Sequence, residues 1–238
     1  MPTMLLLDTA TDVLIVALAN DRGVLAVRAS SEPREHARCL LPWVDALLTE
    51  NGLQRSDLDA VAFDAGPGSF TGLRIGCAAA QGIAYALDIP VLAISSLSIL
   101  AQAAWEQGAC RTGEQVIAVL DARMGECYWQ AFDVTEDGLQ AAGAARVTPP
   151  DQCLSDEAAS STVWCGAGVS ELPESMRAAA GAYRVLSSVQ QPNADAFAVL
   201  ALQALAEGQA VPAALAVPLY VRDRVALTTQ ERADGAVL

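Results

Sequence analysis

The same pattern of residues occurs twice in this chain, and the repeat limits what the chain can fold into. In each half an apolar run ends in an aspartate, and a short polar turn leads to a second apolar run; PTMLLLDTATDVLIVAL contains Asp8, and VIAVLDARMGECYWQAF contains Asp121. Later in each half another apolar run leads into Gly-x-Gly, at residues 66–68 and 166–168. Short apolar runs predict strands, and helical patterns lie between them. The sequence therefore predicts an α/β fold of two lobes with a common design and a cleft between them.

The length and composition of the chain fit two such lobes. We expect the first lobe at residues 1–100 and the second lobe, with the C-terminal tail, at residues 101–238. Of the 238 residues, 53% are hydrophobic, which is enough to fill two cores. The formal net charge of −14 repels phosphate backbones, so we expect the isolated chain not to bind nucleic acid directly.

The N-terminal residues and the cysteines indicate a cytoplasmic protein without membrane contact. The first ten residues, MPTMLLLDTA, contain no basic segment and too few apolar residues for a signal peptide or a membrane span. The six cysteines are scattered and include no C-x-x-C pair. We interpret them as reduced thiols and expect neither a disulfide framework nor a zinc site.

Apolar residues at helical spacing predict three helices in the first lobe. They cover residues 35–51, 71–87 and 95–107. Pro42 lies inside the first and is expected to kink it or to delay its start. In the second helix, TGLRIGCAAAQGIAYAL, the strongly polar residues are Arg74 and Gln81. A helix that is apolar or small on nearly all sides must be covered on nearly all sides, and its own sheet can cover only one. We therefore expect a partner on the other side.

The predicted partner surface combines this helix with the one before it. Gly76 and Ala80 are one turn apart and would form a small groove for a partner helix. Trp43 lies about 100° from the apolar stripe of the preceding helix and is expected to be exposed. The residues that we assign to the partner interface are Trp43, Gly72, Arg74, Gly76, Ala79, Ala80 and Ile83.

The glycine-rich stretch DAGPGSFTGLRIG, residues 64–76, matches none of three known motifs. A Walker loop would need a lysine after Gly72, a dinucleotide-binding loop would need its third glycine one residue earlier, and a hydrolase elbow would need glycines on both sides of Ser69. A tight strand-to-helix turn, with Ser69 or Thr71 as the helix cap, explains the stretch without a ligand. An anion bound at the helix N-terminus is the alternative.

The two aspartates at equivalent strand ends indicate descent from a cleft that binds a magnesium nucleotide. Asp8, Asp121, Gly166 and Gly168 are the candidate residues of this vestigial cleft. We expect no cofactor, because the chain contains no lysine and neither glycine loop contains an arginine to bind phosphate. His36 is the only histidine, and we interpret it as a cap or surface residue at the start of a helix and not as a metal ligand.

Several stretches resemble the TsaB (YeaZ) family: LLLDTAT, REHARCLLP, GPGSFTGLRIG, AQGIAYALDIPVLAISSLSILAQ, DARMGECYW and PLYVRDRVA. The resemblance runs from residue 4 to about residue 226. It implies the ASKHA fold, that of actin, hsp70 and sugar kinases. It also implies a role in making threonylcarbamoyladenosine (t6A) at position 37 of tRNAs that read ANN codons. In that pathway TsaD transfers the threonylcarbamoyl group to adenine, and TsaB and the ATPase TsaE are required partners.

The resemblance further implies that this chain is not an enzyme. TsaD carries a metal-binding H-x-x-x-H after the corresponding strand, and Ser96 and Leu100 stand at the two histidine positions here. The resemblance therefore implies a non-catalytic subunit that forms a heterodimer with TsaD, and a homodimer when alone, through the two predicted interface helices. An ATP-dependent kinase or acyltransferase that uses Asp8 and Asp121 on magnesium is the alternative, and a metallopeptidase is a more distant one.

Overall fold

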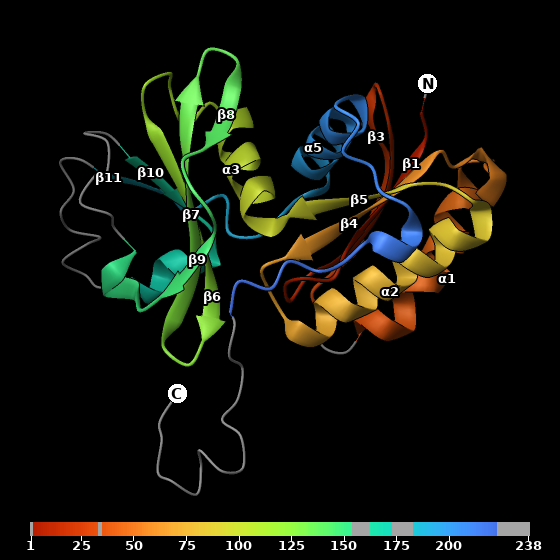
Figure 1. Cartoon of the computed structure of the whole chain (residues 1–238), viewed down its shortest axis with the longest axis horizontal. Coiled ribbons are helices and arrows are strands. Elements are labelled where there is room, and N and C mark those ends of the chain that lie inside the picture. Colours follow the sequence, from red (N-terminus) through yellow and green to blue (C-terminus); the bar gives the residue numbers. More distant parts are fainter. Residues whose placement is uncertain (1, 33–34, 154–161, 173–182, 223–238) are drawn as a thin grey trace, which may run out of the picture.

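The computed structural model describes residues 2–32, 35–153, 162–172 and 183–222, which form two β-sheets with helices around them (Figure 1). The first sheet consists of β1 (Met4–Asp8), β2 (Leu14–Asn20), β3 (Gly23–Ser30), β4 (Ala60–Gly66) and β5 (Val91–Ser95). The second sheet consists of β6 (Gln115–Arg123), β7 (Glu126–Thr135), β8 (Gly138–Ala141), β9 (Arg146–Thr148), β10 (Thr162–Cys165) and β11 (Tyr183–Leu186).

The two sheets have the same topology. Their strand orders are β3-β2-β1-β4-β5 and β11-β10-β6-β7-β8, and β9 pairs with β7 in addition. The central strand β1 is antiparallel to β2 and parallel to β4, just as β6 is antiparallel to β7 and parallel to β10. Asp8 ends β1, and Asp121 lies near the end of β6. The two-lobed α/β fold of duplicated design, the ASKHA type, is therefore confirmed.

The three helices predicted in the first lobe begin and end within one residue of the expected positions. They are α1 (Glu35–Glu50), α2 (Phe70–Leu87) and α3 (Ser96–Glu106), and α5 (Ala194–Ala206) follows later in the chain. Short 3-10 helices occur at η1 (Arg55–Asp57), η2 (Pro150–Gln152), η3 (Ala167–Glu171) and η4 (Ala213–Leu215). Helix α1 begins at Glu35 and runs through Pro42, whose ring is exposed, so Pro42 does not delay its start.

Two of the three apolar cores in the described residues pack on the first sheet, and the third lies between the second sheet and η3. Helices α1 and α2 cover one face of the first sheet, and α3 and α5 lie on the other (Figure 1). The core under α1 and α2 includes Leu5, Leu7, Leu40, Val44, Phe63, Ala80 and Ala84. The core around α3 and α5 joins the two sheets and includes Leu6, Leu97, Leu100, Ala118, Val163 and Phe197. Burial on both faces explains the continuous apolar runs of the central strands.

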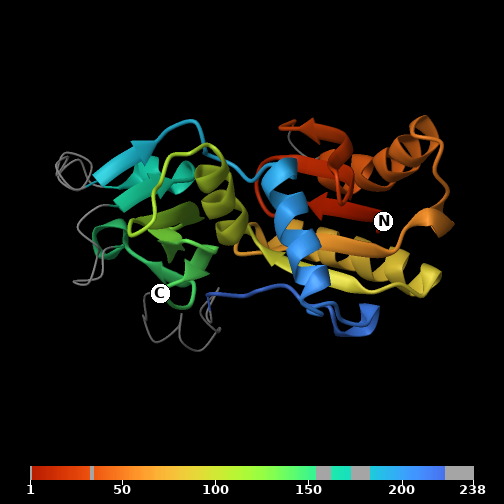
Figure 2. The same cartoon turned by 90° about the horizontal axis from the view of Figure 1, so that it is seen from above.

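The later part of the chain returns to the first sheet. The expected boundary between lobes, near residue 100, falls inside α3, which lies between the two sheets (Figure 2). Helix α5 packs against β2, β3 and β5. Beyond it, Val211 pairs with Val91 of β5, and the Leu219 amide donates to the Ala65 carbonyl at 2.7 Å. Residues 194–219 thus pack against the first sheet, although the sequence-based division assigns them to the second lobe.

All six cysteines lie in the described ranges, and all six are free thiols. Cys39 is half-buried, and the other five cysteines are buried. In the described part of the chain, we find no helix with the length and apolar character needed to cross a membrane.

Candidate functional site

The glycine loop between β4 and α2 packs directly on the turn between β1 and β2. A Cβ atom on Gly68 would lie 2.2 Å from the carbonyl oxygen of Ala10, and one on Gly72 would lie 1.9 Å from that of Thr9. The Ser69 amide donates to the Ala10 carbonyl at 2.7 Å, and the Thr9 hydroxyl donates to the Gly72 carbonyl at 2.7 Å. Only glycine allows so close an approach, so these glycines have a packing role.

The loop also supplies the cap of α2. Ser69 is the N-cap residue, and its hydroxyl accepts a hydrogen bond from the Gly72 amide at 3.2 Å. One of the amide groups that an anion at the helix N-terminus would use is therefore satisfied within the chain. The prediction of a tight turn capped by Ser69 is confirmed, and no phosphate is needed to explain the loop.

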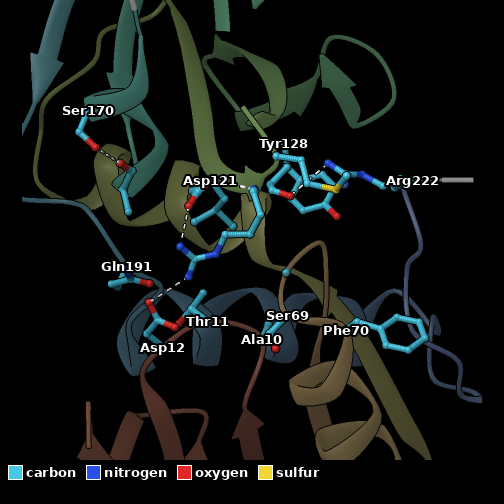
Figure 3. A pocket seen from close by; sticks show the side chains of 16 residues that line it. Ala10, Thr11, Asp12, Ser69, Phe70, Asp121, Tyr128, Ser170, Gln191 and Arg222 are labelled. Carbon is cyan, nitrogen blue, oxygen red and sulfur yellow. Dashed lines mark hydrogen bonds and ion pairs between the residues drawn. The ribbon is translucent and has the colours of Figure 1, made fainter. Parts of the chain in front are cut away.

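A cleft of about 530 Å³ opens between the lobes (Figure 3). Asp121 lines it and forms an ion pair with Arg123, whose Nη1 lies 2.9 Å from the Asp121 carboxylate. The Nη2 atom of Arg123 lies 3.7 Å from the carboxylate of Asp12 in the first lobe. The Arg123 guanidinium therefore lies between the carboxylates of Asp121 and Asp12 at the cleft. The sequence interpretation missed Arg123, although it follows Asp121 by two residues.

Arg222 forms a second basic wall of the cleft, and it too is paired within the chain. Its Nη2 atom donates to the Ala122 carbonyl at 3.1 Å and forms an ion pair with Glu126. Because Arg222 follows the segment that packs on the first sheet, these contacts tie that segment to the turn between β6 and β7. The position of Arg222 depends on the fold, so sequence spacing could not reveal it.

Asp8 does not line the cleft, which corrects the expectation that it points into it. It has no exposed surface, and its Oδ1 atom accepts from the Ala10 amide at 2.9 Å. Its neighbour is Asp64, which is also fully buried and accepts from the Ser96 hydroxyl at 2.6 Å. Burial raises the pKa of Asp8 to about 6. Burial, together with the nearby Asp8 charge, raises the pKa of Asp64 well above its usual value.

Gly166 and Gly168 also serve packing and do not line the cleft. A Cβ atom on Gly166, whose φ is +101°, would lie 2.1 Å from the Val119 carbonyl oxygen. One on Gly168 would lie 2.7 Å from the Leu120 carbonyl carbon. These contacts bring η3 onto β6, as the first glycine loop is brought onto the β1–β2 turn. Ala167 and Ser170 of η3 line the cleft instead.

Three residues assigned to the partner interface lie on the inner side of α2, which corrects the predicted orientation of this helix. Gly72 packs on Thr9, a Cβ atom on Gly76 would lie 2.5 Å from the Thr9 hydroxyl oxygen, and Ala80 has no exposed surface. Gly76 and Ala80 therefore form no outer groove. The residues of α2 are apolar or small on nearly all sides, so the sequence pattern could not distinguish its inner face from its outer face.

The other assigned residues lie along the seam of α1 and α2 or at the surface. Trp43, Ala79 and Ile83 are half-buried and pack against the core between the two helices. Arg74 is exposed; its guanidinium lies 3.7 Å above the Phe70 ring, and its Nε atom donates to the Tyr220 hydroxyl at 3.3 Å. Trp43 is thus less exposed than predicted.

The outer face of α2 consists instead of Ala78, Gly82, Tyr85 and Ala86, all exposed. We call these four residues the α2 outer face. A hollow of about 450 Å³ lies on one side, between this face and α1, and a second of about 490 Å³ lies on the other side, next to η4. Tyr85 has 80% of its surface exposed, which is unusual for so large a ring. The four residues of this face are uncharged, and the paired Asp45 and Arg55 line the hollow toward α1.

Ser96 and Leu100, which stand at the positions of the TsaD histidine pair, lie in the protein interior. Ser96 and Leu100 lie on α3, and both are fully buried, with the Ser96 hydroxyl donating to Asp64. Among the residues that the structure describes, no group of three or more His, Cys, Asp or Glu side chains is arranged to hold a metal ion.

The chain is similar to known proteins over most of its length. Residues 19–229 match the TsaD family, described as tRNA N6-adenosine threonylcarbamoyltransferase. The tRNA threonylcarbamoyladenosine biosynthesis protein TsaB of Escherichia coli K12 is 37% identical over 231 residues, 94% of this chain and 96% of that protein. The protein of the same name from Haemophilus influenzae is 44% identical over 127 residues, 53% of this chain and 52% of that protein. The structure of YeaZ from Pseudomonas aeruginosa is 38% identical, with a TM-score of 0.80 over 92% of this chain and 100% of that one.

Proposed function

The chain belongs to the TsaB (YeaZ) family of t6A biosynthesis proteins, and we propose that it acts as the non-catalytic subunit that docks on the acyltransferase TsaD. In this proposal the chain binds TsaD as a heterodimer, joins TsaE in a larger complex and forms a homodimer when alone. It contacts no membrane. Its net charge of −14 repels the phosphate backbone, so it does not hold tRNA by itself. In this proposal it works in the cytoplasm.

The observation that carries the proposal is the α2 outer face. Ala78 and Gly82 are one turn apart, exposed and small, so a partner helix can approach the backbone closely between them. Tyr85 extends the same face by one turn and offers a large apolar surface. Aromatic residues and the absence of charge at the centre are typical of protein–protein interfaces. Helix packing against this face would bury Tyr85 and fill the two neighbouring hollows.

The cleft supports a non-catalytic role. A magnesium nucleotide needs free carboxylates, but Asp121 is paired with Arg123, and Asp8 is buried away from the cleft. At the positions of the TsaD histidine pair, Leu100 has no metal-binding atom and the Ser96 hydroxyl is engaged by Asp64. Among the described residues, the cleft thus offers no unpaired carboxylate at the positions of Asp8 and Asp121.

The experiment compares two alanine-to-arginine variants at exposed helix positions. Ala78→Arg places a long charged side chain in the α2 outer face, and Ala206→Arg places the same side chain on α5, on the opposite face of the sheet. We expect both variants to fold, Ala78→Arg to run as a monomer and to lose TsaD in pull-down and calorimetry, and Ala206→Arg to behave as wild type. Normal TsaD binding by folded Ala78→Arg would refute the proposed interface.

A third variant checks the orientation of the helix. Ala80→Arg would put a charge in the core under α2, because Ala80 has no exposed surface and packs in the core of the first sheet. A buried unpaired charge costs several kcal/mol, so we expect this variant to unfold. A folded Ala80→Arg protein that merely loses its partner would show that Ala80 faces outward.

A further inference from the structure

Two buried carboxyl groups lie beneath the glycine loop, apart from both the cleft and the α2 outer face. Strands β1 and β4 are parallel neighbours, and Leu7 is paired with Phe63, so Asp8 and Asp64 occupy the next position on each strand. Side chains at matching positions of adjacent strands point to the same face, about 5 Å apart. Neither aspartate has any exposed surface. The fold therefore places two acidic groups side by side, away from water.

One oxygen of each carboxyl group already accepts hydrogen bonds. Oδ1 of Asp8 accepts from the Ala10 amide at 2.9 Å, and Oδ1 of Asp64 accepts from the Gly66 amide at 2.8 Å and from the Ser96 hydroxyl at 2.6 Å. The two Oδ2 atoms are buried and have no donor among the described residues. Ionised carboxylates only accept hydrogen bonds, so two of them cannot satisfy each other, whereas one proton between them satisfies both.

We propose that Asp8 and Asp64 form a buried proton-binding site, in which Asp64 is protonated at neutral pH and donates its O–H to Oδ2 of Asp8. The hydrogen bonds favour this assignment. The carbonyl oxygen of a neutral acid accepts, as Oδ1 of Asp64 does from two donors, and the hydroxyl oxygen is then free to donate. The parallel pairing of β1 with β4 places the two side chains next to each other, and the Oδ2 atom of each is buried and without a partner among the described residues.

The order in which the two groups ionise agrees with this assignment. Burial, then the Asp8 charge, raises the pKa of Asp64 well above its usual value, whereas burial raises the pKa of Asp8 only to about 6. The groups that face the pair from the β1–β2 turn, the glycine loop and the start of α3 are the Ala10 and Gly66 amides and the Ser96 hydroxyl, all uncharged. Asp8 is thus the charge that acts on Asp64 within the described residues.

The shared proton joins three segments that meet at this point. Asp8 holds the β1–β2 turn through Ala10, and Asp64 holds the glycine loop through Gly66 and the start of α3 through Ser96. Without the proton, two negative charges would stand side by side with no cation among their hydrogen-bond partners. Loss of the proton therefore weakens the contact between the glycine loop and the turn on which it rests.

The sign of the pH dependence follows from the raised pKa values. In the unfolded chain an aspartate has a pKa of about 3.9, so above that pH the folded chain binds more protons than the unfolded one. The stabilisation from the proton is complete below the unfolded pKa and is lost as the pH rises through the folded pKa. In this window the folding equilibrium constant falls by up to about tenfold per pH unit for each proton that the folded state retains.

The test measures the stability of the full chain against pH, together with Asp64→Asn and a control. An asparagine keeps the carbonyl acceptor for Gly66 and Ser96 and offers an N–H donor to Asp8, so it imitates the protonated acid. Between pH 6.5 and about 8.5, we expect the folding equilibrium constant of wild type to fall by up to about tenfold per pH unit relative to that of Asp64→Asn. The control Asp137→Asn, at an exposed turn position, should keep the wild-type slope.

A second measurement observes the proton directly and does not depend on whether the variant folds. In wild-type protein labelled with ¹³C at aspartate side chains, we expect one carboxyl carbon at pH 7 to have the chemical shift of a protonated acid. That signal should be absent from Asp64→Asn. Identical pH slopes of wild type and Asp64→Asn, or a wild-type spectrum at pH 7 in which every aspartate is ionised, would overturn the proposal.

Discussion

Gly72 and Gly82 lie on the same helix, and replacing each with alanine should have opposite effects on stability. A Cβ atom on Gly72 would lie 1.9 Å from the Thr9 carbonyl oxygen, whereas one on Gly82 would meet no atom within 4 Å. Thr9 is fully buried, and its hydroxyl donates to the Gly72 carbonyl, so the turn has little room to move away. The first turn of α2 must therefore shift in Gly72→Ala.

The magnitudes follow from these contacts. Overpacking costs about 1–3 kcal/mol, and loss of the hydrogen bond from Thr9 adds about 1 kcal/mol. The better helix propensity of alanine returns up to about 1 kcal/mol, which leaves a net loss of about 1–3 kcal/mol for Gly72→Ala. For Gly82→Ala we expect only the gain in helix propensity, which stabilises the fold by about 0.5–1 kcal/mol. For a chain of this length each kcal/mol shifts Tm by about 2–4 °C, so we expect a fall of roughly 2–12 °C for Gly72→Ala and a rise of roughly 1–4 °C for Gly82→Ala.

Thermal and urea unfolding, followed by circular dichroism on both variants and wild type, measures the difference. Gly72→Ala with a wild-type Tm would refute the close packing of the glycine loop on Thr9 and Ala10. A fall in the Tm of Gly82→Ala would refute the assignment of Gly82 to the open outer side of α2. Either result would also remove the basis for the proposed docking face, since both positions define how α2 is rotated on its sheet.

Three further predictions concern the thiols, the cleft and metal content. In the native protein a thiol reagent should label Cys39 first, whereas Cys165 should stay unreactive until unfolding because burial raises its pKa to about 12; rapid native labelling of Cys165 by mass spectrometry would contradict this. Calorimetry with Mg-ATP should show weak or no binding by the isolated chain, because Asp121 is paired with Arg123; a dissociation constant in the low micromolar range would favour the ATP-dependent enzyme instead. Elemental analysis of untagged protein should find substoichiometric iron and zinc, and a full equivalent of tightly bound metal would contradict the assignment of Ser96 and Leu100 as non-ligands.

Much of the fold is predictable from the sequence because its signals are local. The strand that ends in Asp8 and the strand that contains Asp121 have the same apolar pattern, and they are the equivalent central strands of the two sheets. The start of α2 follows from the capping residue Ser69. In each case the residues that determine the structure are close to one another in the chain.

The site is less predictable because its contacts join distant segments. Nothing in the spacing of Asp8 and Asp64 shows that their strands are neighbours, and this pairing decides that Asp8 is buried away from the cleft. The face of α2 that Ala80 occupies depends on the packing of Gly72 and Gly76 against Thr9, because a helix with small residues on every side has no strong periodic signal. These features can be seen only once the three-dimensional fold is known.

The most direct test of the proposed function is reconstitution of t6A synthesis on tRNA from purified components. The complete mixture contains this chain, TsaD, TsaE, the enzyme that makes threonylcarbamoyl-adenylate, threonine, bicarbonate, ATP and tRNA, and each protein is omitted in turn. We expect t6A, measured by mass spectrometry of digested tRNA, to need both this chain and TsaD, to be restored by Ala206→Arg and to be lost with Ala78→Arg. Modification at the normal rate without this chain, without TsaD or with folded Ala78→Arg would contradict the account.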